Sequence, residues 1–452
     1  MAGLSKSTDM THGSIWKHLA LFAVPLLLGN LFQQLYNTVD SIVLGNFVGK
    51  SALAAIGCTT FICNTLVNFF NGISIGAGII ISTHFGRRDW DKLHETVETA
   101  VLTAIVVGAL VSLLSVPFVP FMLRAISTPE ETMGPASAYL RIYFLGTIFL
   151  FCYNIGSAIL RAVGDTRTPL KILILTSILN ILMDLLFVVA FQWGIAGAAA
   201  ATVVSEAISA FLSLAVLHLS SESFRLTWQD LRFKPDILKS ILLLGMPVGI
   251  QQALTSFSNA FVQSYINSFN STSIMAGWSV YLKLDQFSLL PVMSIGQATT
   301  TFVSQNLGGG DPGRARKGTR TSIVLGSCVV IGIALVLGTF AKSLVSLFNQ
   351  DPEVIYYGTQ FVWMTLPFRF FGVWNQTFAG ALRGAGDTRG PMLIMLFSFV
   401  FCRQAYLFIV TRFVKNIYTV GLGYPFGWVM CAFLSLFYYC WKQRRFDAQS
   451  RP

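Results

Sequence analysis

Twelve mainly apolar runs follow one another along the chain, and each is long enough to cross the roughly 30 Å hydrocarbon core of a bilayer as an α-helix. They cover residues 18–44, 52–82, 93–117, 133–160, 169–192, 194–219, 240–268, 274–304, 318–341, 354–382, 391–411 and 421–441. Only 11% of the residues are charged, which excludes a soluble enzyme of ordinary composition. The sequence therefore predicts an all-α membrane protein with twelve transmembrane helices.

The polar segments between these runs indicate the topology. The N-terminal stretch MAGLSKSTDMTHGSIWKH lacks the short apolar core of a cleavable signal peptide, so the first run is expected to remain in the mature protein. With that stretch inside the cell, most Lys and Arg residues fall on cytoplasmic loops, which accounts for the net charge of +11. We expect both termini to be cytoplasmic, the protein to lie in the cell inner membrane, and no nucleic-acid partner.

A charged turn occurs twice, as LRAVGDTRTPL at residues 160–170 and as LRGAGDTRGPM at residues 382–392. Three landmarks recur at one offset of 222 positions, namely Pro25 and Pro247, Gly86 and Gly308, and Leu160 and Leu382. Two copies of an even number of spans start on the same side of the membrane, which predicts parallel repeats related by a pseudo-two-fold axis along the membrane normal. The expected domains are an N-terminal six-helix lobe (1–219), a cytoplasmic linker (220–239) and a C-terminal six-helix lobe (240–452).

Each copy of the charged turn is expected to close one helix and to open the next. Gly164 and Gly386 can adopt the left-handed conformation that ends a helix, and Pro169 and Pro391 suit the first turn of the following helix. The arginines of the turn then serve as cytoplasmic topology charges or, alternatively, form a contact that locks the two halves in one state.

The proline in the first run, the glycine loop after the second run and the doubled LR-x-x-GDTR-x-P turn resemble the multidrug and toxic compound extrusion (MATE) transporters, in particular their DinF-like branch. The resemblance covers essentially the whole chain. It implies two six-helix lobes around a central cavity and cation-coupled export of amphipathic, mostly cationic compounds. It also implies a cation-coupling site in the N-terminal lobe, matched here by Asp40, Tyr139, Asn154, Asn180, Asp184 and Thr202.

Ionisable side chains inside membrane spans are costly, and they mark functional sites without reference to any family. Asp40 ends a polar face of the first span, and Asn180 and Asp184 lie one turn apart on the fifth. Thr202 lies as far beyond the outer turn near Trp193 as Asp184 lies before it, so the two are expected at similar depth. These four residues are therefore expected to converge.

The repeat provides an internal control for the acidic pair. The positions that correspond to Asp40 and Asp184 in the second half are Val262 and Tyr406, so the carboxylates occur only in the first half. A purely structural pair would be expected in both halves. The asymmetry favours a functional role.

Two carboxylates close together in a low dielectric repel one another, so the pair is expected to bind a proton or a cation. The sequence does not choose between H⁺ and Na⁺. For Na⁺ the oxygen ligands would come from Asp40, Asn180, Asp184 and Thr202, by analogy with other oxygen-ligated cations. Substrate contacts are expected from a further set of polar residues, Gln33, Tyr36, Asn37 and Asp285.

The sequence thus predicts an H⁺- or Na⁺-coupled antiporter that exports amphipathic organic cations and related drugs by alternating access. The alternative is a flippase for a lipid or a lipid-linked sugar, from the same wider superfamily. An enzyme is not expected, because the HExxH motif is absent and the seven cysteines form no CxxC pair. We further expect no cofactor, contact with membrane lipid and a monomeric state.

Overall fold

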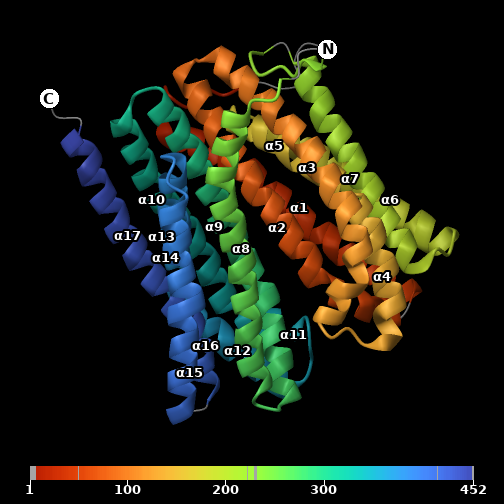
Figure 1. The fold of residues 1–452 in the computed structure, drawn as a ribbon. Coiled ribbons are helices and arrows are strands. Elements are labelled where there is room, and N and C mark those ends of the chain that lie inside the picture. The colour runs from red at the N-terminus through yellow and green to blue at the C-terminus, as the bar shows by residue number, and fades with distance from the viewer. Residues whose placement is uncertain (1–6, 49, 221, 229–231, 415, 450–452) are drawn as a thin grey trace. The chain divides into compact units, whose positions relative to one another are not determined.

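The computed structural model describes residues 7–48, 50–220, 222–228, 232–414 and 416–449, and all regular elements in these ranges are helices (Figure 1). The first half of the chain forms α1 (Ile15–Phe47), α2 (Lys50–Arg87), α3 (Trp90–Ala125), α4 (Glu130–Leu145), α5 (Thr147–Ala162), α6 (Arg167–Asp184), the π-helix η1 (Leu185–Ala190) and α7 (Gly194–Leu219). The predicted linker follows, and its residues 221 and 229–231 lie outside the described ranges.

The second half repeats this succession of long helices. It forms α8 (Pro235–Asn267), α9 (Thr272–Gly308), α10 (Pro312–Thr339), α11 (Ala341–Ser346), α12 (Pro352–Thr365), the 3₁₀ turn η3 (Leu366–Phe368), α13 (Phe370–Gly384), α14 (Arg389–Leu396), the π-helix η4 (Phe397–Cys402), α15 (Arg403–Phe413), α16 (Ile417–Gly421) and α17 (Gly423–Gln449). The short helix α11 was not predicted from the sequence.

Helices coincide with all twelve predicted spans, although they differ in apolarity and continuity. Within the described residues, nine helices are long and apolar enough to cross a membrane, and the bent pair α4–α5 makes a tenth. The remaining two predicted spans are α9, which carries Lys283 and Asp285 in its middle, and α12–α13, which is interrupted by η3. Polar and charged residues lower the mean hydropathy of α9, and the break leaves α12 and α13 with 14 and 15 residues, each too short to span alone.

Two spans that were expected to be continuous are broken, for identifiable reasons. The predicted run 133–160 bends by 47° between α4 and α5 at Gly146, whose missing Cβ leaves room for the side chain of Val203. The run 354–382 is interrupted by η3 at Pro367, which has no N–H to continue the helical ladder. Sequence hydropathy does not register either change of direction.

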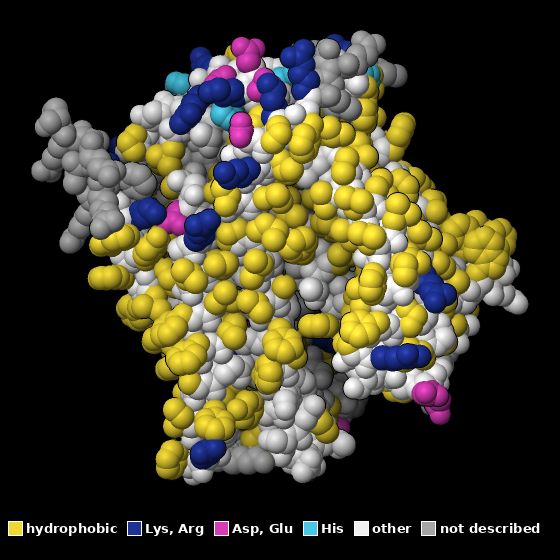
Figure 2. Space-filling view, viewed as in Figure 1, with side chains coloured by type: hydrophobic (Ala, Val, Ile, Leu, Met, Phe, Trp, Pro, Cys, Tyr) yellow, Lys and Arg dark blue, Asp and Glu magenta, His cyan; other side chains and the backbone are white. Residues whose placement is uncertain are grey.

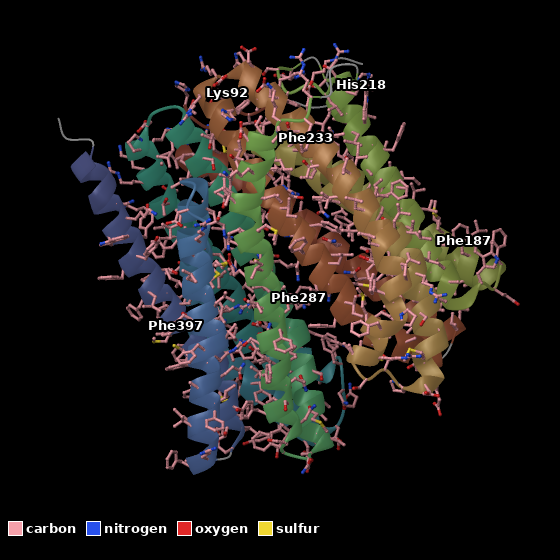
Figure 3. The ribbon with its side chains drawn as sticks, in the orientation of Figure 1. Lys92, Phe187, His218, Phe233, Phe287 and Phe397 are labelled. Atoms are coloured by element: carbon pink, nitrogen blue, oxygen red, sulfur yellow. The ribbon has the colours of Figure 1, made fainter. Side chains whose placement is uncertain are left out.

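Apolar side chains cover the sides of the helices, and charged side chains collect at helix ends (Figure 2). Phe121 on α3, Phe211 on α7 and Phe437 on α17 are each more than 70% exposed. Lys92 and His218 lie at the same end of the first-half helices, as Figure 3 shows. Such an exposed apolar surface is stable only in lipid, which supports a multi-pass membrane protein.

The chain folds as two compact units. The first unit contains residues 7–10 and 24–249, and the second contains residues 11–23 and 250–449. In the first unit α5 packs against α2, α3 and α7, while α4 and α6 also contact α7. In the second unit α9 packs against α10, α12 and α13, and α13 contacts α17. The predicted domain limits at residues 219 and 240 remain a prediction.

The doubled turn has the predicted local geometry. Gly164 and Gly386 have φ angles of +89° and +82°, the left-handed conformation, and each follows the C-terminus of a helix. Pro169 and Pro391 lie in the first turns of α6 and α14. At Gly164 a Cβ atom would also stand 2.4 Å from the carbonyl oxygen of Thr8, so glycine is required there for two reasons.

Candidate functional site: a buried acidic cluster

Three helical segments of the first unit bring Asp40 and Asp184 together. Val43 and Leu44 of α1 pack against Val188 of η1 and Ala198 of α7, which fixes the second half of α1 beside the end of α6. Asp40 then lies next to Asp184, close enough for the two carboxyl groups to interact directly. The sequence prediction that this pair converges agrees with this geometry.

The pair is poorly supplied with hydrogen-bond donors. Asp184 has no exposed surface, and neither of its oxygens receives a hydrogen bond from an amide or hydroxyl group of the described residues. The same holds for one oxygen of Asp40. Both polar atoms of the Asn180 amide, one turn before Asp184, are also buried without a partner among the described residues. A buried polar group without a partner is costly, so this cluster favours an occupant that supplies positive charge or a proton.

The π-helix η1 begins directly after Asp184, and Phe187 of this segment is labelled in Figure 3. A π-helix widens the turn and shifts the register of the following side chains, and such segments are frequent at functional sites. The polar face of α6 therefore ends at Asp184, and apolar residues follow. This local change of geometry was not predicted from the sequence.

Thr202 of α7 is buried in the first unit, at 8% exposure, and its hydroxyl donates to the carbonyl oxygen of Ala198 at 3.1 Å. Since α7 packs along α6, Thr202 belongs to the same helix pair as Asn180 and Asp184. Its hydroxyl oxygen keeps lone pairs for a cation, because it acts as the donor in that bond.

Glu206 is a third carboxylate of this region, and the sequence analysis did not assign it to the site. It lies one turn after Thr202 on α7, and its charge acts on Tyr36, Tyr139 and Tyr143. One of its oxygens is buried without a hydrogen-bond partner among the described residues. The signal available in the sequence was the four-residue spacing from Thr202, which places both side chains on one face of α7.

Tyr36 and Tyr139 belong to the same cluster. Both lie close enough to Asp40 and Glu206 to be influenced by their charges. Tyr139 stacks on Tyr143 with ring centroids 6.1 Å apart. The acidic cluster is thus lined by tyrosine rings, whose faces attract organic cations.

Three more predicted residues of the first half lie on α1 and α5. Gln33 and Asn37 are exposed on α1. Asn154 lies on α5, where its amide nitrogen donates to the carbonyl oxygen of Leu150 at 3.0 Å. The resemblance to a known site did not predict this intrahelical bond.

The last predicted residue, Asp285, belongs to the second unit and is engaged in an ion pair. Its carboxylate lies 3.2 Å from a guanidinium nitrogen of Arg369. Lys283, which precedes it by two positions, instead places its ammonium group over the ring of Phe348 at 5.5 Å. The carboxylate expected to contact substrate is thus paired within the protein, and Lys283 is not its partner.

The donor set also bears on which ion the acidic cluster would hold. Within the described ranges, no three His, Cys, Asp or Glu residues are arranged so that they could hold a metal ion. A Na⁺ ion at Asp40 and Asp184 would therefore depend on the neutral oxygens of Asn180 and Thr202. A proton would need only the two carboxylates.

Comparison with known proteins identifies the family. The MatE family model matches residues 25–186 and 247–407. The chain belongs to the MatE family. The two matched segments begin at Pro25 and Pro247, the pair whose offset revealed the repeat. The predicted resemblance to MATE transporters is confirmed, whereas the DinF-like branch stays a prediction.

Relatives of this MatE protein are similar over nearly its whole length. "Probable multidrug resistance protein YpnP" of Bacillus subtilis is 30% identical over 450 residues, which cover 97% of this chain and 98% of the relative. "Probable multidrug resistance protein NorM" of Thermotoga maritima is 26% identical and covers 88% of this chain and 86% of the relative.

Solved structures share the fold of this MatE protein. A multidrug resistance MATE family transporter of the MOP superfamily, in an outward-facing conformation, superimposes with a TM-score of 0.91 at 20% identity, over 99% of this chain and 100% of the other. The predicted fold, an all-α membrane protein with twelve transmembrane helices in two lobes, is thereby confirmed. The family consists of membrane transporters, which confirms the prediction that this MatE protein is not an enzyme.

Proposed function

We propose that this MatE protein is a cation-coupled antiporter that exports small amphipathic, mostly cationic organic compounds by alternating access. The proposal depends most on one observation, the contact between the carboxyl groups of the buried Asp184 and the half-buried Asp40, which receive almost no hydrogen bonds from the described residues. The names of the relatives, which describe multidrug resistance and export, agree with it.

The proposed coupling follows from the electrostatics of the pair. Two adjacent carboxylates that receive no hydrogen bonds cannot both stay charged without a bound cation. The site therefore binds H⁺ or Na⁺ when it is open to the outside. The bound ion neutralises the carboxylates and weakens their hold on a cationic substrate. Release of the substrate outside and of the ion inside completes the exchange.

The tyrosines near Glu206 extend this site toward the substrate. A flat organic cation can stack on Tyr36, Tyr139 or Tyr143 while Glu206 balances its charge. Glu206 would then act on the substrate, while Asp40 and Asp184 act on the coupling ion. Gln33 and Asn37, which are exposed on α1, would contact polar parts of the substrate.

The flippase alternative predicts basic residues for a lipid phosphate in place of an acidic pair. Among the described residues of the acidic cluster, the charged side chains are Asp40, Asp184 and Glu206, which favours export of cations over lipid translocation. Export of dye without movement of lipid would exclude this second candidate.

The experiment uses purified protein in proteoliposomes loaded with a fluorescent organic cation. A pH gradient and a Na⁺ gradient are imposed separately, and export is recorded for the wild type and for Asp40→Asn. We expect one gradient to drive export by the wild type and neither to drive it in the variant. Undiminished gradient-driven export by Asp40→Asn, with correctly folded protein, would contradict the proposal.

A further inference from the structure

The second unit contains its own buried charged cluster, and it is basic. Arg369 and Arg403 are only 4% and 2% exposed, and they lie at the start of α13 and at the start of α15. Arg369 is paired with Asp285. Arg403 has no carboxylate within ion-pair distance among the described residues. The cluster therefore carries one more positive charge than negative charge.

Hydrogen bonds hold the guanidinium of Arg403 in place, but they do not use all of its donors. One of its terminal nitrogens, Nη2, donates to the Ser258 hydroxyl at 2.8 Å and to the Asn259 side-chain oxygen at 2.9 Å. Its Nε is buried without an acceptor among the described residues, and the same is true of Nε of Arg369. Gln404 donates to Ser258 as well, which fixes the acceptor that orients Arg403.

Both arginines stack on aromatic rings that lie one turn apart on α17. The Arg403 guanidinium is 4.9 Å from the ring centroid of Tyr424, and the Arg369 guanidinium is 4.8 Å from that of Trp428. The two rings are themselves in edge contact, with centroids 6.0 Å apart. Stacking occupies the faces of a guanidinium and leaves its edge donors directed to in-plane acceptors, which is the geometry that binds carboxylate and phosphate.

The cluster is accessible at its margin. Asn259, which accepts from Arg403, is exposed on α8, and Asp285 is 17% exposed. The π-helix η4 ends immediately before Arg403, as η1 begins immediately after Asp184. Each unit thus places a π-helix next to its buried unpaired charge.

A buried cation without a counter-ion is strongly unfavourable in a membrane protein, and such residues occur where they bind something. We propose that Arg403, supported by Asn259 and Tyr424, forms an oxyanion-binding site that takes the carboxylate or phosphate of an amphipathic compound. The transporter then handles zwitterionic and anionic amphiphiles in addition to simple cations. This inference builds on the proposed export function and concerns the second unit alone.

The test compares two dyes that differ only at the anionic group, a carboxylate-bearing rhodamine and its ethyl ester. Export of both is measured in proteoliposomes for the wild type and for Arg403→Gln. We expect Arg403→Gln to export the carboxylate dye about tenfold more slowly than the wild type. Its export rate for the ester should stay within about twofold of the wild-type rate, because only the carboxylate dye carries an oxyanion. Equal losses for both dyes, or no loss for either, would overturn the inference.

Arg412 provides the matched control. It lies on α15 like Arg403, but it stacks on Phe408 near the helix end. Arg412→Gln removes the same charge and should leave the export of both dyes unchanged. A selective loss of the carboxylate dye in this variant would show that net charge, and not the built site, decides selectivity, and would also overturn the inference.

A second variant covers a failure of Arg403→Gln to fold. Asn259→Leu removes an exposed acceptor that orients the guanidinium, and it should weaken binding of the carboxylate dye about threefold, measured by fluorescence polarisation on purified protein. Unchanged affinity for both dyes would count against the site. Failure of the proposed export function gives a different result. In that case Asp40→Asn exports the ester dye at the same rate as the wild type.

Two sources could supply the oxyanion, a transported compound or a lipid head group. The same assays are repeated in phosphatidylcholine vesicles with and without phosphatidylglycerol. Inhibition of carboxylate-dye export by phosphatidylglycerol in the wild type but not in Arg403→Gln would support the site and assign lipid phosphate as a competing occupant. Selective dye loss in Arg403→Gln in both lipid mixtures would support the site with the dye carboxylate as its ligand.

Discussion

The two halves of this transporter share an architecture but bury opposite charges. The first unit contains Asp40, Asp184 and Glu206 within its spans, whereas the second buries Arg369 and Arg403, and among the described residues Asp285 is the one carboxylate paired with either arginine. None of these residues has the same charged type at the position 222 residues away. A duplicated fold therefore tolerates either sign of charge, and the chemistry of each half is set by a few substitutions on equivalent helices.

The largest expected effect separates coupling from stability. Asp184→Asn should reduce gradient-driven export to background, because it removes one member of the acidic pair. Asp285→Asn should instead keep the dependence of export on the gradient and lower the free energy of unfolding by about 3 kcal/mol, because it leaves Arg369 buried without its counter-ion. Transport assays and thermal denaturation in detergent measure the two effects. Loss of coupling in Asp285→Asn would break the proposed division between the halves.

A smaller effect is expected from the third carboxylate. Glu206→Gln should weaken the affinity for a monovalent organic cation about tenfold and preserve the driving ion, because Glu206 lies among tyrosines and, within the described ranges, forms no three-carboxylate metal group with the pair. Equilibrium dye binding and gradient-driven transport are recorded together. A change in the driving ion with unchanged dye affinity would reassign Glu206 to the coupling site.

The first helices of the two halves, α1 and α8, differ at one packing position, where α1 has Ala23 and α8 has Gly245. In the first unit a Cβ at Gly245 of α8 would stand 2.6 Å from the Cα of Ile73 of α2, and a Cβ at Gly76 would stand 2.6 Å from the backbone of Gly245. Gly245→Ala introduces the residue found at the equivalent position, Ala23, and should destabilise the protein by about 1–3 kcal/mol through overpacking.

Gly332 is the control for this substitution. Nothing lies within 4 Å of a Cβ at this position on α10, so Gly332→Ala should be neutral or slightly stabilising. Thermal denaturation of both variants in the same detergent checks the pair. Equal melting temperatures would show that α2 and α8 separate readily at this crossing.

The smallest effect concerns the second copy of the charged turn. Burial raises the pKa of Asp387, but hydrogen bonds from Lys442, the Gly390 amide and Tyr438 outweigh it, so the pKa of Asp387 lies below its usual range. A lowered carboxyl pKa stabilises the fold above the unfolded-state value near 4, and this stability is lost as the pH falls through the folded-state value. Asp387→Asn should therefore lower stability by about 1 kcal/mol at pH 7, and the effect should shrink as the pH falls below about 4.

The first copy of the turn uses its aspartate differently. Asp165 accepts hydrogen bonds from the amides of Arg167 and Thr168 and from the Thr168 hydroxyl, and it has no ion pair among the described residues. Asp165→Asn should therefore destabilise the protein less than Asp387→Asn at pH 7, because it breaks no ion pair. Thermal denaturation of both variants at pH 7 compares them, and a larger loss of stability for Asp165→Asn would reverse this assignment.

The sequence by itself determined the membrane class, the twelve spans, the repeat and the acidic pair. Hydrophobic length, a fixed offset and the cost of a carboxylate in lipid are properties of the chain that do not depend on packing. The helical spacing of Asn180 and Asp184 and the left-handed glycines of the doubled turn are local in the same sense.

Only the tertiary structure decided which polar groups find partners. Asp285 resembled Asp184 in the sequence as a carboxylate within a span, but Arg369 lies beside Asp285 and no cation lies beside Asp184 in the described structure. Glu206 entered the acidic cluster, and Arg403 was left without a carboxylate among the described residues, because residues far apart in the chain meet or fail to meet through helix packing. Whether a buried charge has a counter-ion depends on which side chains are brought together by tertiary packing. Hydropathy and spacing along the chain do not specify these contacts.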